Sequence, residues 1–133
     1  MVCEDDSGLR SSIKRLIIKS SEEKKQFIEV EESINGLECL YKIYKDFTLG
    51  NNYDAILIDE SMPFMKGSSC ISILKTMHLE GSLNKIKTVS ISSFDDLETI
   101  KFIKSNGCDE ILPKPHTKEV ISKFLDTLTS QYL

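Results

Sequence analysis

The chain has 133 residues and a formal net charge of −4, with 17 Lys+Arg against 21 Asp+Glu. This length suits one domain, and we expect residues 1–133 to form it. The acidic balance argues against a dedicated nucleic-acid binder, which usually carries a basic face. Because no apolar run approaches the ~20 residues that span a bilayer, we also expect no membrane contact by this domain.

The cysteines and the N-terminus predict a cytoplasmic, reducing environment. The four cysteines lie in apolar runs without a CxxC pair, and neither histidine is near them in sequence, so a zinc site has little support. Free cysteines usually behave as small buried hydrophobic residues. The sequence becomes acidic at Glu4, which is not the pattern of a secretory signal peptide.

The chain opens with a short strand and a helix. Residues 1–3 are apolar and stop at an acidic run. The helical repeat that follows has Ser7 as its predicted N-cap. Residues 19–26 are charged and predict a connector. The apolar residues of this helix are Leu9, Ile13, Leu16 and Ile17.

A second and a third strand are predicted around a second helix. Residues 27–31 alternate as in a strand, which Asn35 and Gly36 interrupt. Residues 53–58 form the most apolar strand, typical of one buried on both faces of a parallel sheet. The apolar residues predicted to face the core from the helix between them are Leu37, Leu40, Tyr41, Tyr44 and Phe47.

Further strands and helices complete the chain. Residues 62–67 predict a loop before a third helix, and residues 86–91 predict a fourth strand. Residues 95–96 are an acidic pair that can cap a fourth helix. Residues 110–113 predict a fifth strand before a last helix. The apolar residues of that helix are Val120, Ile121, Phe124, Leu125 and Leu128.

Strand and helix alternate five times, which predicts a parallel sheet with helices on both faces. Ligands of such sheets bind beyond the carboxyl ends of the strands. Those ends carry acidic residues 4–6, Asp59, Ser92 with Ser93, and Lys114. Carboxylates at this density suit Mg²⁺. A carboxylate nucleophile beside Mg²⁺, an ammonium and a hydroxyl has the parts for phosphoryl transfer.

Several segments in this order resemble the response-regulator receiver domain, and together they cover essentially the whole chain. The resemblance implies a flavodoxin-like (βα)5 doubly wound parallel sheet with strand order 2-1-3-4-5. The segments that carry it are the acidic residues 4–6 with Arg10, residues 53–67 with Asp59, Met62, Pro63 and Gly67, and residues 107–115 with Lys114 and Pro115.

The resemblance implies that Asp59 is the phosphoacceptor and that Mg²⁺ is the cofactor. Glu4 and Asp5 correspond to the family's acidic pair, because Arg10 then falls at the family's usual distance. Asp6 is left as a helix cap. The Mg²⁺ ligands would be Asp5 directly, Glu4 through water, Asp59, and the backbone carbonyl of Ser61.

The resemblance also implies a switch and a phosphodonor. Ser92 would be the hydroxyl that moves onto the phosphoryl group, and Lys114 would pair with that group. The bond between Lys114 and Pro115 is usually cis in the family. A histidine kinase or a histidine phosphotransfer protein would be the donor.

Three features depart from the family's pattern. Ile111 occupies the place of an aromatic residue, which puts aromatic-gated switching in doubt, and Ser92 replaces the commoner Thr. The first strand is very short, which suggests a domain cut from a longer chain. The link at residues 79–85 resembles the corresponding link in receivers attached to hybrid histidine kinases.

Phe64 and Met65 are apolar residues in the loop beside the predicted site, and they either cover the core or form a partner surface.

Two other functions fit part of the pattern. A receiver-like interaction module would keep the fold but bind partners without phosphorylation; retention of Asp59 and Lys114 argues against it. A phosphatase of the haloacid-dehalogenase type would need a second Asp two residues after Asp59, where Ser61 stands.

Overall fold

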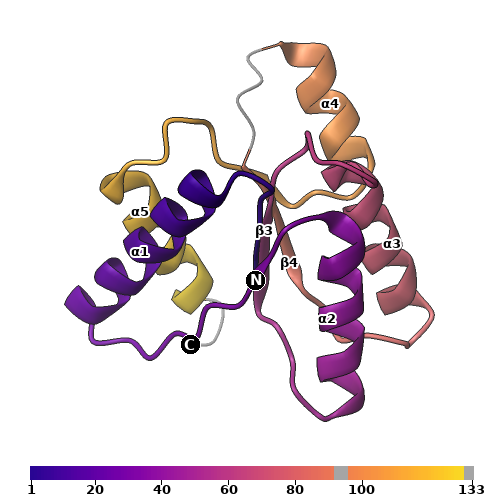
Figure 1. Ribbon diagram of the computed structural model, residues 1–133, viewed down its shortest axis with the longest axis horizontal. Coiled ribbons are helices and arrows are strands. Elements are labelled where there is room, and N and C mark those ends of the chain that lie inside the picture. The colour runs from indigo at the N-terminus through magenta and orange to yellow at the C-terminus, as the bar shows by residue number, and fades with distance from the viewer. Residues whose placement is uncertain (92–95, 131–133) are drawn as a thin grey trace.

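The computed structural model describes residues 1–91 and 96–130, and its centre is a five-stranded sheet in which every pairing is parallel (Figure 1). The strand order β2-β1-β3-β4-β5 confirms the predicted flavodoxin-like topology. The strands are β1 Val2–Cys3, β2 Glu32–Ser33, β3 Ala55–Ile58, β4 Lys87–Ser90 and β5 Glu110–Ile111.

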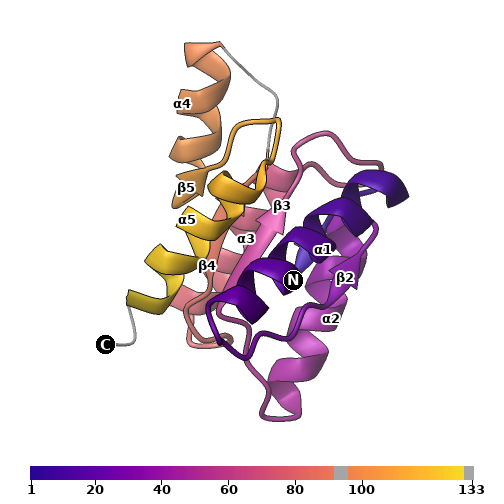
Figure 2. The ribbon, with the colours of Figure 1, turned by 90° about the vertical axis from the view of Figure 1, so that its left-hand side faces the viewer.

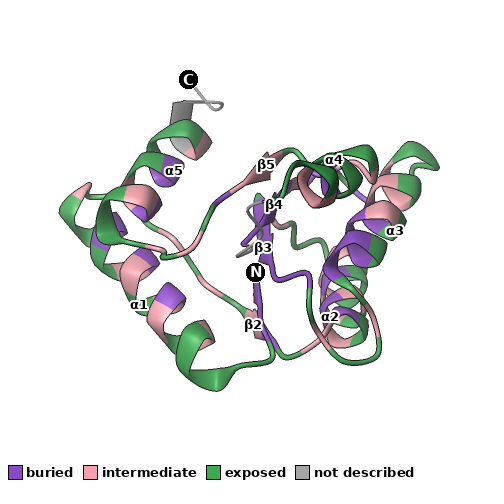
Figure 3. Ribbon diagram, turned by 90° about the horizontal axis from the view of Figure 1, so that it is seen from above, coloured by how far each residue is buried: buried purple, intermediate pink, exposed green. Residues whose placement is uncertain are grey.

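Helices cover both faces of the sheet. Viewed from above, α1 and α5 lie on one side of the strands, and α2, α3 and α4 lie on the other (Figure 3). Figure 2, turned by a quarter, shows α1 and α5 in front of the sheet. The helices are α1 Ser7–Glu23, α2 Gly36–Thr48, α3 Gly67–Leu79, α4 Leu97–Ser105 and α5 Lys118–Ser130.

Strand β3 is buried at all four positions, as its apolar sequence predicts. Because side chains alternate along a strand, it contributes to a separate core on each face. Ala55 and Leu57 join the cluster formed with α1 and α5, whereas Ile56 and Ile58 join the cluster formed with α2 and α3. This double burial makes β3 the central strand from which the site is built.

Side-chain caps set the beginnings of three helices. Asp6, rather than Ser7, caps α1, because its Oδ1 accepts from the amide of Leu9 at 2.9 Å. Asn35 caps α2, and Asp96 caps α4, in the same way. Such caps satisfy amides that the helix itself leaves without acceptors.

The second strand is displaced from its predicted place. Helix α1 continues to Glu23, so it includes much of the predicted connector, and β2 is formed by Glu32–Ser33 instead of residues 27–31. The short β1 sets this register: Val2 donates its amide to the carbonyl of Glu31 at 2.8 Å. The alternating segment 27–31 packs Ile28 and Val30 against the α1–α5 cluster, and only its last residue, Glu31, accepts a backbone hydrogen bond from β1.

Helix α2 turns only part of the predicted apolar face toward the sheet. Cys39 and Ile43 are buried, with Leu40 and Phe47 partly buried beside them. The other three predicted core positions, Leu37, Tyr41 and Tyr44, are exposed. The helix therefore carries two apolar stripes, and the sheet covers one of them.

All four cysteines are buried and free, which confirms their expected packing role. Within residues 1–91 and 96–130, no helix combines the length and apolarity that crossing a bilayer requires.

Candidate functional site

The site begins where two neighbouring strands end. β1 and β3 pair with Cys3 opposite Ile58, so the residues that follow them, Glu4 and Asp59, leave the sheet side by side. Asp59 donates its amide to the carbonyl of Cys3 at 3.1 Å, and Glu4 donates its amide to Ser33 of β2 at 3.1 Å. The backbone at both acidic positions is therefore held by the sheet.

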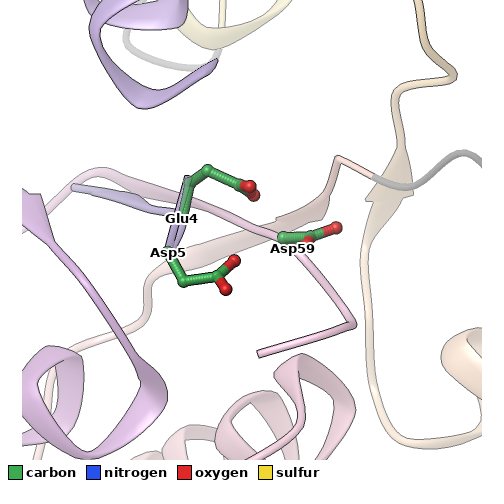
Figure 4. A group of neighbouring side chains, drawn as sticks. All are labelled: Glu4, Asp5 and Asp59. Carbon is green, nitrogen blue, oxygen red and sulfur yellow. The ribbon is translucent and has the colours of Figure 1, made fainter. Parts of the chain in front are cut away.

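Three carboxylates converge at this edge. Each of them places one carboxylate oxygen within 4.8 Å of an oxygen of the other two; the three residues are Glu4, Asp5 and Asp59 (Figure 4). Glu4 and Asp59 are 2% and 8% exposed, and Asp5 is exposed. Like charges this close repel strongly unless a proton or a cation offsets them.

Burial is the main cause of the raised pKa values of Glu4 and Asp59. Burial, followed by the neighbouring Asp59 charge, raises the pKa of Glu4 to about 7. Burial also raises the pKa of Asp59, and the nearby Lys114 ammonium opposes that shift. The Nζ of Lys114 lies 3.8 Å from Oδ1 of Asp59, which is close enough to attract but leaves the ammonium without a tight hydrogen bond.

Arg10 does not neutralise the cluster. Its Nη1 donates to the backbone carbonyl of Glu4 at 2.8 Å, and its Nε lies 3.4 Å from the carboxylate of Glu32.

The Oε2 atom of Glu4 is buried without a hydrogen-bond partner among the described residues. A buried carboxylate oxygen of this kind is costly, so the donor set fits a hard divalent cation such as Mg²⁺, which prefers carboxylate oxygens.

The helix that follows the loop packs directly on the backbone of Asp59. A Cβ atom on Gly67 would lie 2.3 Å from the carbonyl oxygen of Asp59, so only glycine fits there. Glu60 is buried and binds Ser68 in the first turn of α3. Sequence reasoning missed Glu60; the only local signal was the missing capping side chain before this helix.

The remaining predicted residues fall into three groups. Lys114 reaches the cluster, and its bond to Pro115 is cis, as the family resemblance implied. Ser61 is exposed two residues after Asp59, and the role of its carbonyl stays a prediction. Ser92, and Ser93 beside it, lie outside the described residues.

The two apolar residues of the loop, Phe64 and Met65, lie in different surroundings. Phe64 is 83% exposed, with a φ of 70°, so it does not cover the core. Met65 packs against the core and lies next to Gly36 at the start of α2. Ile111 is partly buried against the same core cluster, in the place of the family's aromatic residue. His116 precedes α5, as expected.

Comparison with known proteins points to one family. The sequence model of the response regulator receiver domain matches residues 1–126. The peroxide stress-activated histidine kinase mak1 of Schizosaccharomyces pombe is 26% identical over 95 residues, which are 71% of this chain and 6% of that protein. The chain thus spans a small part of this relative.

Solved structures share the fold at low sequence identity. The receiver domain of Francisella response regulator 1452 is 23% identical, with a TM-score of 0.72 over 99% of this chain and 96% of that one. The phosphorylated cyanobacterial phytochrome response regulator RcpA is 17% identical, with a TM-score of 0.78 over 98% and 92%. Vibrio cholerae chemotaxis protein CheY4 is 20% identical, with a TM-score of 0.70 over 96% and 94%.

Proposed function

Since the chain belongs to the response regulator receiver domain family, we propose that Asp59 accepts a phosphoryl group from phosphohistidine and thereby switches a partner surface. The observation that carries the proposal is the convergence of Glu4, Asp5 and Asp59 at the carboxyl ends of β1 and β3, with Lys114 beside them. A nucleophile, a cation site and an ammonium are the groups that phosphoryl transfer requires.

In the transfer step, a carboxylate oxygen of Asp59 attacks phosphorus and forms an acyl phosphate. The bond between phosphorus and the donor imidazole nitrogen breaks, and the released nitrogen takes a proton from solvent. Asp59 must be ionised to attack. Burial raises its pKa and opposes this, and Lys114 counteracts that effect. Water later hydrolyses the acyl phosphate, which releases inorganic phosphate and restores the carboxylate.

Mg²⁺ would be held by Glu4, Asp5, Asp59 and the backbone carbonyl of Ser61. The support is the acidic cluster and the partnerless buried oxygen of Glu4. When bound, the ion supplies positive charge that offsets the phosphoryl oxygens. Glu4 and Asp5 would orient it, and the sheet holds the backbone of Glu4 through its amide.

Lys114 is the second electrostatic group of the proposal. Its ammonium lies beside the carboxylate that would carry the phosphoryl group, and it would move from Asp59 to a phosphoryl oxygen. Ser92 would donate a hydrogen bond from its hydroxyl to the same phosphoryl group. The surface formed by β4, α4, β5 and α5 would then change between two states.

The partner and setting are inferred from chemistry. A histidine kinase or histidine phosphotransfer protein supplies phosphohistidine, and a histidine kinase is among the relatives. Residues 1–133 would act as a single receiver unit, either alone or within a hybrid kinase. Four buried free cysteines suit the reducing cytoplasm.

The test is phosphorylation by a small donor. With Mg²⁺ and acetyl phosphate, the intact mass should rise by one phosphoryl group. Asp59→Asn should show no gain, because its amide is not a nucleophile for phosphorus. Asp126→Asn, which alters an exposed carboxylate on α5, is the matched control and should gain the group like the parent chain.

Two outcomes of this experiment would contradict the proposal that Asp59 is the phosphoacceptor. If neither acetyl phosphate nor phosphoramidate adds mass, the phosphoacceptor function is wrong and a non-phosphorylated interaction module takes its place. Mass gain that persists in Asp59→Asn would show that another residue is the acceptor.

A further inference from the structure

We propose that Glu60 is a positioning residue, which holds the loop at residues 60–67 so that Asp59 and the adjacent backbone keep the geometry for binding Mg²⁺. This inference rests on the proposed function, because it assigns Glu60 a role in the same reaction. Glu60 does not belong to the acidic cluster formed by Glu4, Asp5 and Asp59.

The carboxylate of Glu60 is tied to the first turn of α3. Its Oε2 accepts from the amide of Ser68 at 2.9 Å, and its Oε1 accepts from the hydroxyl of Ser68 at 2.6 Å. Both residues are buried, at 8% and 2% exposure. Hydrogen bonds to a charged acceptor are stronger than neutral ones, and a negative charge is favoured at a helix N-terminus.

Glu60 takes the place of a local helix cap. Lys66 occupies the N-cap position of α3 and makes no capping hydrogen bond with its side chain. The acceptor comes instead from the residue directly after the phosphoacceptor, across the whole loop. The beginning of α3 is therefore fixed relative to the end of β3.

A backbone bond closes the loop at the same point. Gly67 donates its amide to the carbonyl of Glu60 at 3.1 Å, and the helix turn there approaches the carbonyl of Asp59 so closely that a Cβ on Gly67 would overlap it. The main chain and the side chain of Glu60 thus both bind the start of α3. Ser61 lies in the loop between these contacts, and its backbone carbonyl is one of the proposed Mg²⁺ ligands.

Glu60 and Asp59 have different roles because their side chains reach different partners. Asp59 joins the carboxylate cluster, whereas Glu60 binds α3. Loss of the Glu60 carboxylate would leave the amide and hydroxyl of Ser68 without this acceptor and would free the loop. The Mg²⁺ ligands on either side of Glu60 would then be less well ordered.

The test is Mg²⁺ affinity, measured by titration calorimetry on the full chain. Glu60→Ala should weaken binding about 10-fold, the low end for loss of a group that orients metal ligands. Glu60→Gln should retain most of the affinity, because its amide oxygen can accept from the Ser68 amide while its NH₂ donates to the Ser68 hydroxyl. Glu80→Ala, at the exposed far end of α3, is the matched control and should not change binding.

A second readout requires no metal. Amide hydrogen exchange at Gly67 and Ser68 should be faster in Glu60→Ala than in the parent chain when Mg²⁺ is absent. If Glu60→Ala does not fold, Ser68→Ala serves instead, since it removes the hydroxyl bond alone and should weaken Mg²⁺ binding by a smaller factor.

The two proposals fail in different ways. Unchanged Mg²⁺ affinity in Glu60→Ala, with normal binding by the parent chain, overturns the role of Glu60 and leaves the proposed function intact. Equal losses in Glu60→Gln and Glu60→Ala also overturn it, because charge rather than positioning would then be responsible. A parent chain that binds no Mg²⁺ overturns the metal site itself, and the role of Glu60 with it.

Discussion

Glu4 shows how folding creates a need for positive charge at this site. The sheet buries its carboxylate at the end of β1, close to Asp59, and leaves its Oε2 without a partner among the described residues. Arg10 is close in sequence, but it binds the Glu4 carbonyl and the side chain of Glu32. Burial, followed by the neighbouring Asp59 charge, therefore raises the pKa of Glu4 to about 7, and a proton or a metal ion would offset its charge.

This shift predicts how stability depends on pH when metal is absent. Glu4 binds its proton more tightly in the native state than in the unfolded chain, so the associated stability is complete below pH 4.5 and is lost as the pH rises through about 7. Glu4→Gln lacks this loss. Above pH 7 it should be more stable than the parent chain by on the order of 1 kcal/mol.

Urea unfolding in EDTA, repeated across that pH range, measures the difference between the two chains. Asp5→Asn changes an exposed carboxylate of the same cluster and should have a smaller effect. Parallel stability curves for Glu4→Gln and the parent chain would contradict the assignment of this titration to Glu4.

At the scale of elements, the second strand shows the limit of alternation as a signal. Residues 27–31 alternate like a strand, and two of their side chains do pack inward, but β2 forms only at Glu32–Ser33. The pairs of the β1–β2 ladder are Val2 with Glu32 and Cys3 with Ser33. Side-chain alternation therefore identified which residues face the core but not where the hydrogen-bonded ladder lies.

Substitutions in this segment separate packing from pairing. Phe27 is 90% exposed, so Phe27→Ser should change the free energy of unfolding by no more than about 0.5 kcal/mol. Val30 packs against the α1–α5 cluster, and Val30→Ser should cost about 1 kcal/mol, less than a fully buried valine. Chemical denaturation of the two variants measures both values. A large loss in Phe27→Ser would mean that the segment packs differently.

At the scale of the whole molecule, the strand order assembles the site. β1 lies between β2 and β3, so the ends of β1 and β3 meet although α1, β2 and α2 separate them along the chain. β5, at the far edge of the sheet, leads into the segment that carries Lys114. Residues from three parts of the sequence therefore depend on the complete fold to come together.

Metal binding should stabilise the whole domain. A ligand that binds only the native state at about 100 times its Kd adds about 2.7 kcal/mol to the free energy of unfolding. Mg²⁺ should therefore raise the melting temperature of the parent chain, and Asp5→Asn should reduce that increase. NaCl at equal ionic strength is the control. An equal rise with NaCl would mean that general screening, not a specific site, is responsible.

The alternation of strands and helices, the acidic residues after β1 and β3, and the lysine–proline pair were all readable from the sequence, because local spacing and order along the chain encode them. Three features needed the tertiary structure. The partner strand decided the place of β2, and the sheet decided which of two apolar stripes α2 buries. Glu60 caps α3 because the loop reverses and brings Ser68 back to it. Each is a contact between residues that no local pattern links, so its position depends on how the whole chain packs.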